Sequence, residues 1–239
     1  MTMVLVATFV VVTLAWFVWL LLLLAPSLIV KAHEAKQALA DQAPVAHGLL
    51  AELAVSAGIA WPQLYVFSSP HPNGFVVASG HLQAIVVTDA IFERLNPEQL
   101  RGLFALLTAC LARRAARAET AVVAIALALS PFLLPSLALA RWALPGRRWH
   151  DIDGAAAALV GSHAVAETLA ALDAASARAR DIRVAAVSPL CCVAPAPSGS
   201  RLTRSFATHP PTRERIARVR RHAAIPATSP ARRESPSWR

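Results

Sequence analysis

The chain has 239 residues, of which 56% are hydrophobic and only 15% are charged, and its net charge is +9. Globular proteins contain about 25% charged residues, so this composition disfavours an ordinary soluble enzyme. The positive charge lies at one end, because residues 201–239 hold ten arginines and two acidic residues. Composition therefore excludes a uniformly basic nucleic-acid domain and a collagen-like chain, and three cysteines are too few for a disulfide scaffold.

The first 30 residues contain no charged side chain, and the run from Val4 to Val30 is almost continuously apolar. About 20 such residues cross a bilayer core, so the run predicts one transmembrane anchor. A cleaved signal peptide is the alternative, but no basic residue precedes the run and the run exceeds the apolar core of a signal peptide. Lys31 and Lys36 follow the run, which favours a cytoplasmic body.

Residues 31–60 predict two helices, with a break near Pro44 and the second helix beginning at Val45. Short runs of β-forming residues follow, and turn-forming residues separate them. We expect three strands: Leu64–Phe67, Gly74–Ala78 and Ala84–Thr88.

A longer helix is predicted to begin at Asn96, because Asn96 can cap it, Pro97 suits its first position and Gln99 can return the capping bond. Residues 121–140 form a second uncharged stretch, interrupted by Ser130-Pro131 and Pro135. This stretch is long enough to span a membrane once, but the prolines also allow a re-entrant hairpin.

The second half of the chain is predicted to be helical, from Asp153 to Ala179 and again after Thr212, with a linker at residues 185–200. The chain then divides into five parts. They are an anchor (1–30), the two parts of one folded domain (31–120 and 145–223), an apolar membrane-embedded or re-entrant segment between them (121–144), and a disordered basic tail (224–239).

Five motifs stand in an order that resembles the HtpX-type membrane zinc metallopeptidases, a gluzincin group of quality-control proteases of bacterial inner membranes. The motifs are Leu64-Tyr65-Val66, Pro72-Asn73-Gly74-Phe75 (usually PNAF in the family), Ala84-Ile85-Val86-Val87-Thr88, Leu95 to Gly102 (LNPEQLRG), and Phe206 to Ile216 (FATHPPTRERI). The resemblance implies an α+β, mainly helical fold, with a small β-sheet beside the former active-site helix. It also implies the bacterial inner membrane, and the positive charge after the apolar run and in the tail favours a cytoplasmic body and tail.

The catalytic residues of that family are absent from the matching positions. The family's helix carries HExxH, whose histidines bind zinc and whose glutamate activates water. Here the two histidine positions hold Leu106 and Cys110, and the general-base position holds Leu107. The third ligand, a glutamate four residues before a retained aspartate (Asp153), is replaced by Trp149. We therefore expect no catalytic residue, no metal ligand and no cofactor.

A substitute metal site is the alternative, and zinc would be a cofactor only there. The ligand-capable residues near the former site are Cys110, His150, Asp151 and His209. The simpler interpretation is that Cys110 packs in the core and that His209 shapes the start of the last helix. In that case Asp153, His209, Pro210 and Arg215 form a structural motif kept from the family. The remaining histidines lack metal-ligand spacing and are predicted to be exposed: His33, His47, His71, His81, His163 and His222.

Asn73, Gly74 and Phe75 match the family's edge strand, along which an extended substrate adds as an extra strand. Such β-augmentation needs only free backbone groups and side-chain pockets, so a catalytically dead relative can still use it. The alternative is that these three residues only maintain the fold, and the sequence leaves both interpretations open.

Three functions remain. The first is a membrane-anchored pseudopeptidase that binds membrane-protein clients or regulates a partner through the retained cleft. The second is an active metalloendopeptidase with unconventional ligands. The third is a membrane-tethered basic module that contacts anionic lipid or nucleic acid. The arginine-rich end lacks interleaved aromatic residues apart from Trp238. We therefore expect membrane lipid and a peptide or membrane-protein client as partners, and no nucleic acid.

Overall fold

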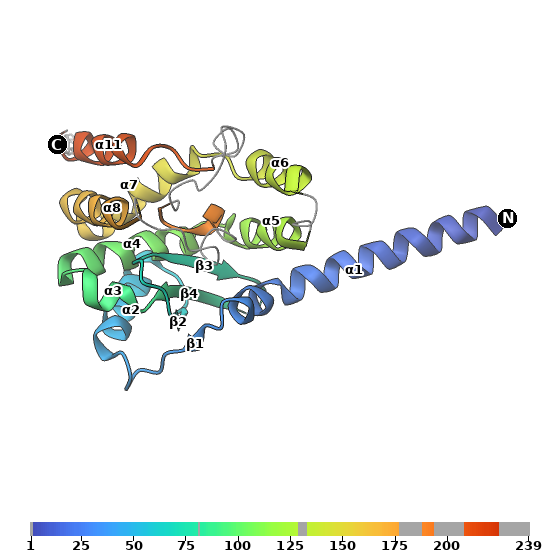
Figure 1. Cartoon of the computed structure of the whole chain (residues 1–239), viewed down its shortest axis with the longest axis horizontal. Coiled ribbons are helices and arrows are strands. Elements are labelled where there is room, and N and C mark those ends of the chain that lie inside the picture. The colour runs from blue at the N-terminus through green and yellow to red at the C-terminus, as the bar shows by residue number, and fades with distance from the viewer. Residues whose placement is uncertain (1, 81, 129–132, 177–187, 194–207, 225–239) are drawn as a thin grey trace, which may run out of the picture.

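The structure, a computed structural model, describes residues 2–80, 82–128, 133–176, 188–193 and 208–224 (Figure 1). Some side chains inside helices are also outside this description, among them those of residues 14, 18, 21 and 22. The described residues form a mainly helical body around one small mixed sheet. The predicted α+β class is therefore confirmed.

Within the described residues, four strands form one sheet in the order β1-β2-β4-β3. β4 (Gln83–Thr88) runs parallel to β2 (Gln63–Phe67) and antiparallel to β3 (Gly74–Ala78). The two-residue β1 (Lys36–Gln37) pairs antiparallel with β2. The three predicted strands are thus confirmed to within one residue, and β3 is an edge strand.

Helices cover both faces of this sheet. Val76 and Val87 point into a buried cluster with α2 (Pro44–Ala57) and α4 (Pro97–Ala112). Phe75 and Val86 point the opposite way, into a second cluster with the end of α1 (Thr2–Ala32) and with α5 (Ala116–Ala128). This alternation follows from the two-residue period of a strand. Because both faces are covered, β3 and β4 are almost entirely buried.

The central helix is α4, which contacts α2, α7 (Arg148–Val160) and α8 (Ser162–Ser176). It begins at the predicted capping box, since Gln99 N donates to Asn96 Oδ1 (2.8 Å) and Asn96 N donates to Gln99 Oε1 (3.1 Å). Gly102 lets α8 approach α4 closely, because a Cβ there would meet Thr168 and the Ala164 carbonyl. The other helices of the body are α3 (Ala90–Arg94), α7 (Arg148–Val160), α8 (Ser162–Ser176) and α11 (Thr212–Ala224).

The first helix, α1 (Thr2–Ala32), packs only its final part against the sheet, and its N-terminal part extends away from the body (Figure 1). α5 (Ala116–Ala128) contacts both α1 and α6 (Leu133–Ala143). Over the residues that the structure describes, no helix is both long enough and apolar enough to span a membrane.

Several expectations were wrong in detail. The first of the two helices predicted in residues 31–60 does not form, because α1 ends at Ala32 and Lys36–Gln37 join the sheet as β1. The helix predicted from Asp153 is two helices, and Gly161, with φ at 91°, separates them. His33 is buried, because its ring lies against Phe67 and Phe75.

Some predictions fall on residues that are not described. The basic tail lies outside the described residues from position 225 on, and so does most of the linker at residues 185–200. His81 and the side chain of His222 lie outside them too.

Candidate functional site

The three positions on α4 that correspond to the histidines and the glutamate of HExxH are buried. Leu106 and Leu107 have no exposed surface, and Cys110 is 5% exposed. All three belong to the buried cluster between α4, the sheet and α7. Leu107 points at β3, where its Cδ1 atom would lie 2.9 Å from a Cβ built on Gly74. The former general-base position is therefore part of the hydrophobic core.

Trp149, at the position of the third zinc ligand, is 1% exposed. Its ring stacks on the His209 ring, with centroids 4.6 Å apart and an angle of 24° between the planes. The guanidinium carbons of Arg215 and Arg148 lie 4.7 Å and 5.3 Å from its centroid. Such cation–π contacts gain strength when they are shielded from water. A cluster of aromatic rings and guanidinium groups thus occupies the position of the third zinc ligand.

Asp153 and Arg215 form a buried ion pair that joins α7 to α11. Arg215 donates through Nε (2.9 Å) and Nη2 (2.6 Å) to the two carboxylate oxygens of Asp153, and both residues are at most 2% exposed. A bidentate arrangement fixes the geometry as well as the charge balance. The predicted structural motif is brought together here, although its proposed role remains a prediction.

Three side chains hold the backbone of residues 191–193, and we call Asn73, His209 and Arg215 the carbonyl clamp. Each donates to a different carbonyl oxygen. The contacts are Asn73 Nδ2 to Val193 O (2.9 Å), His209 Nε2 to Cys191 O (2.8 Å) and Arg215 Nη1 to Cys192 O (2.6 Å). The clamp residues come from motifs about 140 positions apart in the sequence, so only the fold brings them together.

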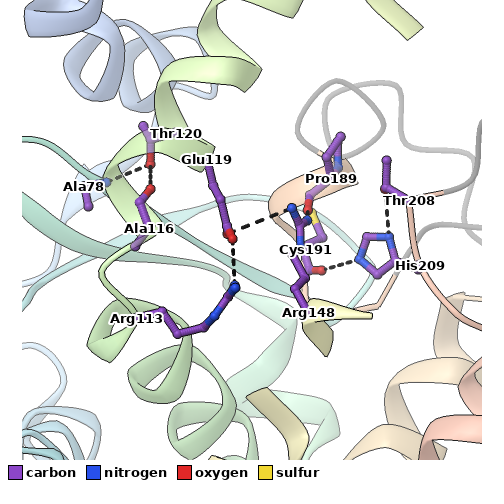
Figure 2. Close-up of polar contacts among 10 residues, drawn as sticks. All are labelled: Ala78, Arg113, Ala116, Glu119, Thr120, Arg148, Pro189, Cys191, Thr208 and His209. Atoms are coloured by element: carbon purple, nitrogen blue, oxygen red, sulfur yellow. Dashed lines mark hydrogen bonds and ion pairs between the residues drawn. The ribbon is translucent and has the colours of Figure 1, made fainter. Parts of the chain in front are cut away.

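Residues 190–193, which we call the inner strand, begin at the last residue of the 3-10 helix η1 (Ser188–Leu190) and contact the edge of β3. Phe75 and Cys191 form an antiparallel β-bridge, and Cys192 N donates to Gly74 O at 2.9 Å. Further along the same edge, Ala78 N donates to Thr120 Oγ1 of α5 at 3.0 Å (Figure 2). The edge that we predicted to bind a peptide is therefore paired with the chain itself at these positions.

A second polar network lies beside the inner strand (Figure 2). Glu119 accepts from Arg113 at 2.6 Å and lies 3.9 Å from Arg148. Arg148, which is 5% exposed, also donates to the Pro189 carbonyl. These arginines and Glu119 had no motif to identify them, because their pairing depends on how α5 and α7 pack.

The electrostatics of this region disfavour a bound cation. Burial raises the pKa of the Cys110 thiol to about 12, so the sulfur stays protonated at neutral pH. Burial also lowers the pKa of His209 to about 3, which keeps its ring neutral. Arginine stays charged in proteins, so Arg148 and Arg215 place positive charge around Trp149.

The residues at this site do not fit a zinc ion. Leucine offers no lone pair, the indole nitrogen of Trp149 is only a donor, and the Cys110 thiol is protonated. His209 already donates Nε2 to Cys191 O, and its Nδ1 faces Thr208 Oγ1 at 3.1 Å (Figure 2).

The substitute ligand set is not assembled either. His150 faces Glu214 at 3.9 Å, and Asp151 is exposed. Over the described residues, no group of three His, Cys, Asp or Glu side chains is placed to hold a metal.

Comparison with known proteins points to one family. The sequence model of Peptidase family M48 matches residues 40–223. A protease HtpX homolog from Pseudarthrobacter chlorophenolicus is 29% identical over 220 residues, which are 77% of this chain and 74% of that protein. One from Desulfatibacillum aliphaticivorans is 26% identical over 227 residues, 80% and 73% of the two chains. A third, from Persephonella marina, is 38% identical over 76 residues, and this match spans 26% of that protein.

Proposed function

The chain belongs to peptidase family M48, in its HtpX-type group, and we propose that it is a catalytically inactive member of that group. It binds extended segments of membrane-protein clients, or regulates a partner, without cutting a peptide bond. The observation that carries this proposal is the burial of Leu107 and Trp149, because core side chains fill the places of the general base and a zinc ligand.

Family M48 peptidases normally depend on zinc, which polarises the scissile carbonyl and activates water. That chemistry needs lone-pair donors at several positions at once. Leu106, Cys110 and Trp149 provide none at neutral pH, and Leu107 cannot take a proton from water. The four positions are linked through one packed core, so a single substitution cannot rebuild the site.

Cleavage of fluorescein-labelled casein by the purified full-length chain tests the proposed inactivity. The protease HtpX homolog of Pseudarthrobacter chlorophenolicus, assayed in parallel, is the comparison. We expect no cleavage by this chain above background, with or without added zinc. Chelator-sensitive cleavage would contradict the proposal and support an active metalloendopeptidase with unconventional ligands.

We also propose that α1 anchors the chain in the bacterial inner membrane. Residues 1–30 carry no charge, and many of the large apolar side chains of α1 are exposed, among them Phe9, Trp16, Phe17 and Trp19. Support comes from the sequence, in which the apolar run from Val4 to Val30 exceeds the about 20 residues that a hydrocarbon core needs, although the described residues alone include no helix that qualifies as a span. Lys31 in the last turn of this helix and Lys36 after it favour a cytoplasmic body and tail.

Residues 121–144 are proposed to enter the membrane as a helical hairpin rather than to cross it. α5 and α6 contact each other, and α5 also contacts α1 (Figure 1). A hairpin returns the chain to the side of the membrane from which it entered. α4 before this segment and α11 after it both pack against α7, so the two helices must lie on the same side. A reporter fused at the C-terminus tests this topology: we expect activity only for a cytoplasmic reporter, and a periplasmic signal would contradict it.

Membrane lipid is the second proposed partner, through the exposed arginines of α11. Arg213, Arg218 and Arg221 are exposed on this helix, and basic side chains near an anionic leaflet attract it. Binding to vesicles that contain phosphatidylglycerol should fall with added salt and should be absent for vesicles of phosphatidylcholine. If the chain bound DNA as strongly as it binds these vesicles, and with the same sensitivity to salt, the alternative of a basic module would be favoured.

A further inference from the structure

The carbonyl clamp and the inner strand together form a filled peptide site. An extended peptide that binds by β-augmentation needs a free sheet edge, donors for its carbonyls and pockets for its side chains. The inner strand, residues 190–193, already has all three. It bridges Phe75 of β3, and its carbonyls accept from the carbonyl clamp.

The inner strand also fills pockets on both sides. Leu190 and Cys191 belong to the buried cluster with Phe75, while Cys192 and Val193 belong to the cluster with α4. All four side chains are at most 4% exposed. The segment therefore contacts the sheet edge through its backbone at Cys191 and Cys192, and it fills one pocket with its first two side chains and the other pocket with its last two.

We propose that the inner strand is a built-in pseudosubstrate, which the carbonyl clamp holds on the edge of β3. An extended client segment binds there only when the inner strand leaves. This inference rests on the proposed function, since it describes how the same cleft is regulated. The observed affinity for a client is then the affinity of the open form multiplied by the fraction of molecules in which the edge is open.

The proposal explains why the clamp residues remain in a chain that has lost the residues of the zinc site. Asn73, His209 and Arg215 each act on a backbone carbonyl, so their contacts need no metal. Asn73 also accepts from Gly74 N at 2.9 Å, which orients its amide toward the inner strand. The neutral His209 ring has one N–H, which donates to the Cys191 carbonyl of the inner strand.

His209→Phe tests the clamp with little change in shape. Phenylalanine keeps a flat ring against Trp149 and removes the donor to Cys191 O, together with the contact between Nδ1 and Thr208 Oγ1. Loss of one hydrogen bond should open the inner strand about fivefold more often. Hydrogen exchange at the Cys192 amide, which donates to Gly74 O, should therefore be about fivefold faster.

Binding of fluorescein-labelled casein, followed by anisotropy, provides the second readout. We expect about fivefold tighter binding by His209→Phe than by the natural chain, in step with the exchange rate. His47→Phe is the matched control, because His47 also contacts a backbone carbonyl (Ala38 O, 2.9 Å) and a tryptophan ring (Trp61) away from the clamp. It should change neither readout at this site.

Asn73→Asp is a second variant for the case that His209→Phe does not fold. It keeps the shape of the side chain and replaces the donor to Val193 O, so exchange and casein binding should both rise. Unchanged exchange at Cys192 in a folded clamp variant would overturn the proposal. Faster exchange with unchanged or absent casein binding would also overturn it, because the segment would then be only part of the fold. Cleavage of casein would instead refute the proposed inactivity, whatever the exchange rate.

Discussion

Leu107 packs directly against the backbone of Gly74, so that a Cβ on Gly74 would lie 2.9 Å from Leu107 Cδ1 and 3.1 Å from Val87 Cγ1. Protein cores are close-packed and do not absorb such overlaps without shifts. In the family pattern this strand position is usually alanine and the helix position is glutamate. The two differences fit each other, because the missing methyl group makes room for the leucine.

Gly74→Ala should therefore destabilise the protein by about 1–3 kcal/mol, through overpacking against Leu107. The free energy of unfolding in urea measures the effect. Leu107→Ala alone removes a buried side chain and should destabilise by about 2–5 kcal/mol. In the double variant the new methyl group occupies part of the vacated space. We expect its destabilisation to be smaller than the sum of the two single effects, and simple additivity would contradict the direct contact.

Gly102→Ala should destabilise the contact between α4 and α8. The added Cβ would overlap the Thr168 hydroxyl and lie 2.8 Å from the Ala164 carbonyl oxygen. We expect a loss of about 1–3 kcal/mol, measured as above. Gly48→Ala is the control within a helix, since nothing beyond its chain neighbours and its own helix backbone lies within 4 Å of its Cβ position. That control should be neutral or more stable by about 0.5–1 kcal/mol, and equal losses in both variants would refute the close approach.

Arg215→Met should destabilise the chain by about 3–5 kcal/mol, because it leaves the buried carboxylate of Asp153 without its partner. Arg220→Met, in the same helix, breaks an exposed pair with Glu167 and should change stability by about 1 kcal/mol or less. Thermal unfolding of the two variants side by side gives the comparison. Similar melting temperatures would show that the buried pair does not hold α11 on α7.

The stability of the fold should fall as the pH is lowered from about 6.5 toward 3, partly because of His209. Burial lowers its folded pKa to about 3, so the unfolded chain binds a proton in this range and the folded chain does not. The stability that the neutral His209 ring contributes is fully present above pH 6.5. Below that pH this group lowers the free energy of unfolding by at most about 1.4 kcal/mol per pH unit. His209→Phe lacks the group, so the stability difference between the two proteins should shrink toward low pH. A constant difference would contradict the buried neutral ring.

Local signals in the sequence were enough to predict much of the fold. The capping box at Asn96 and Gln99 specified the start of α4, and runs of β-forming residues between turn-forming residues placed β2, β3 and β4. The motif order also identified the family, and through it the positions of Leu107 and Trp149. These features are local, so short stretches of sequence are sufficient to recognise them.

Other features depend on packing between distant segments. Nothing next to Lys36 indicates β1, which forms only because β2 offers it an edge. The inner strand lies in a region that the sequence predicts to be a linker. Its pairing with β3 joins positions more than 100 residues apart. The pairing of Arg148 with Glu119 likewise exists only after α5 and α7 have packed.

The zinc content of the purified full-length chain tests the central claim most directly. After incubation with zinc and dialysis, we expect less than about 0.1 zinc ion per chain, because the positions of the ligands hold leucine, tryptophan and a protonated thiol. One zinc ion per chain, removed by a chelator together with cleavage of casein, would contradict the account.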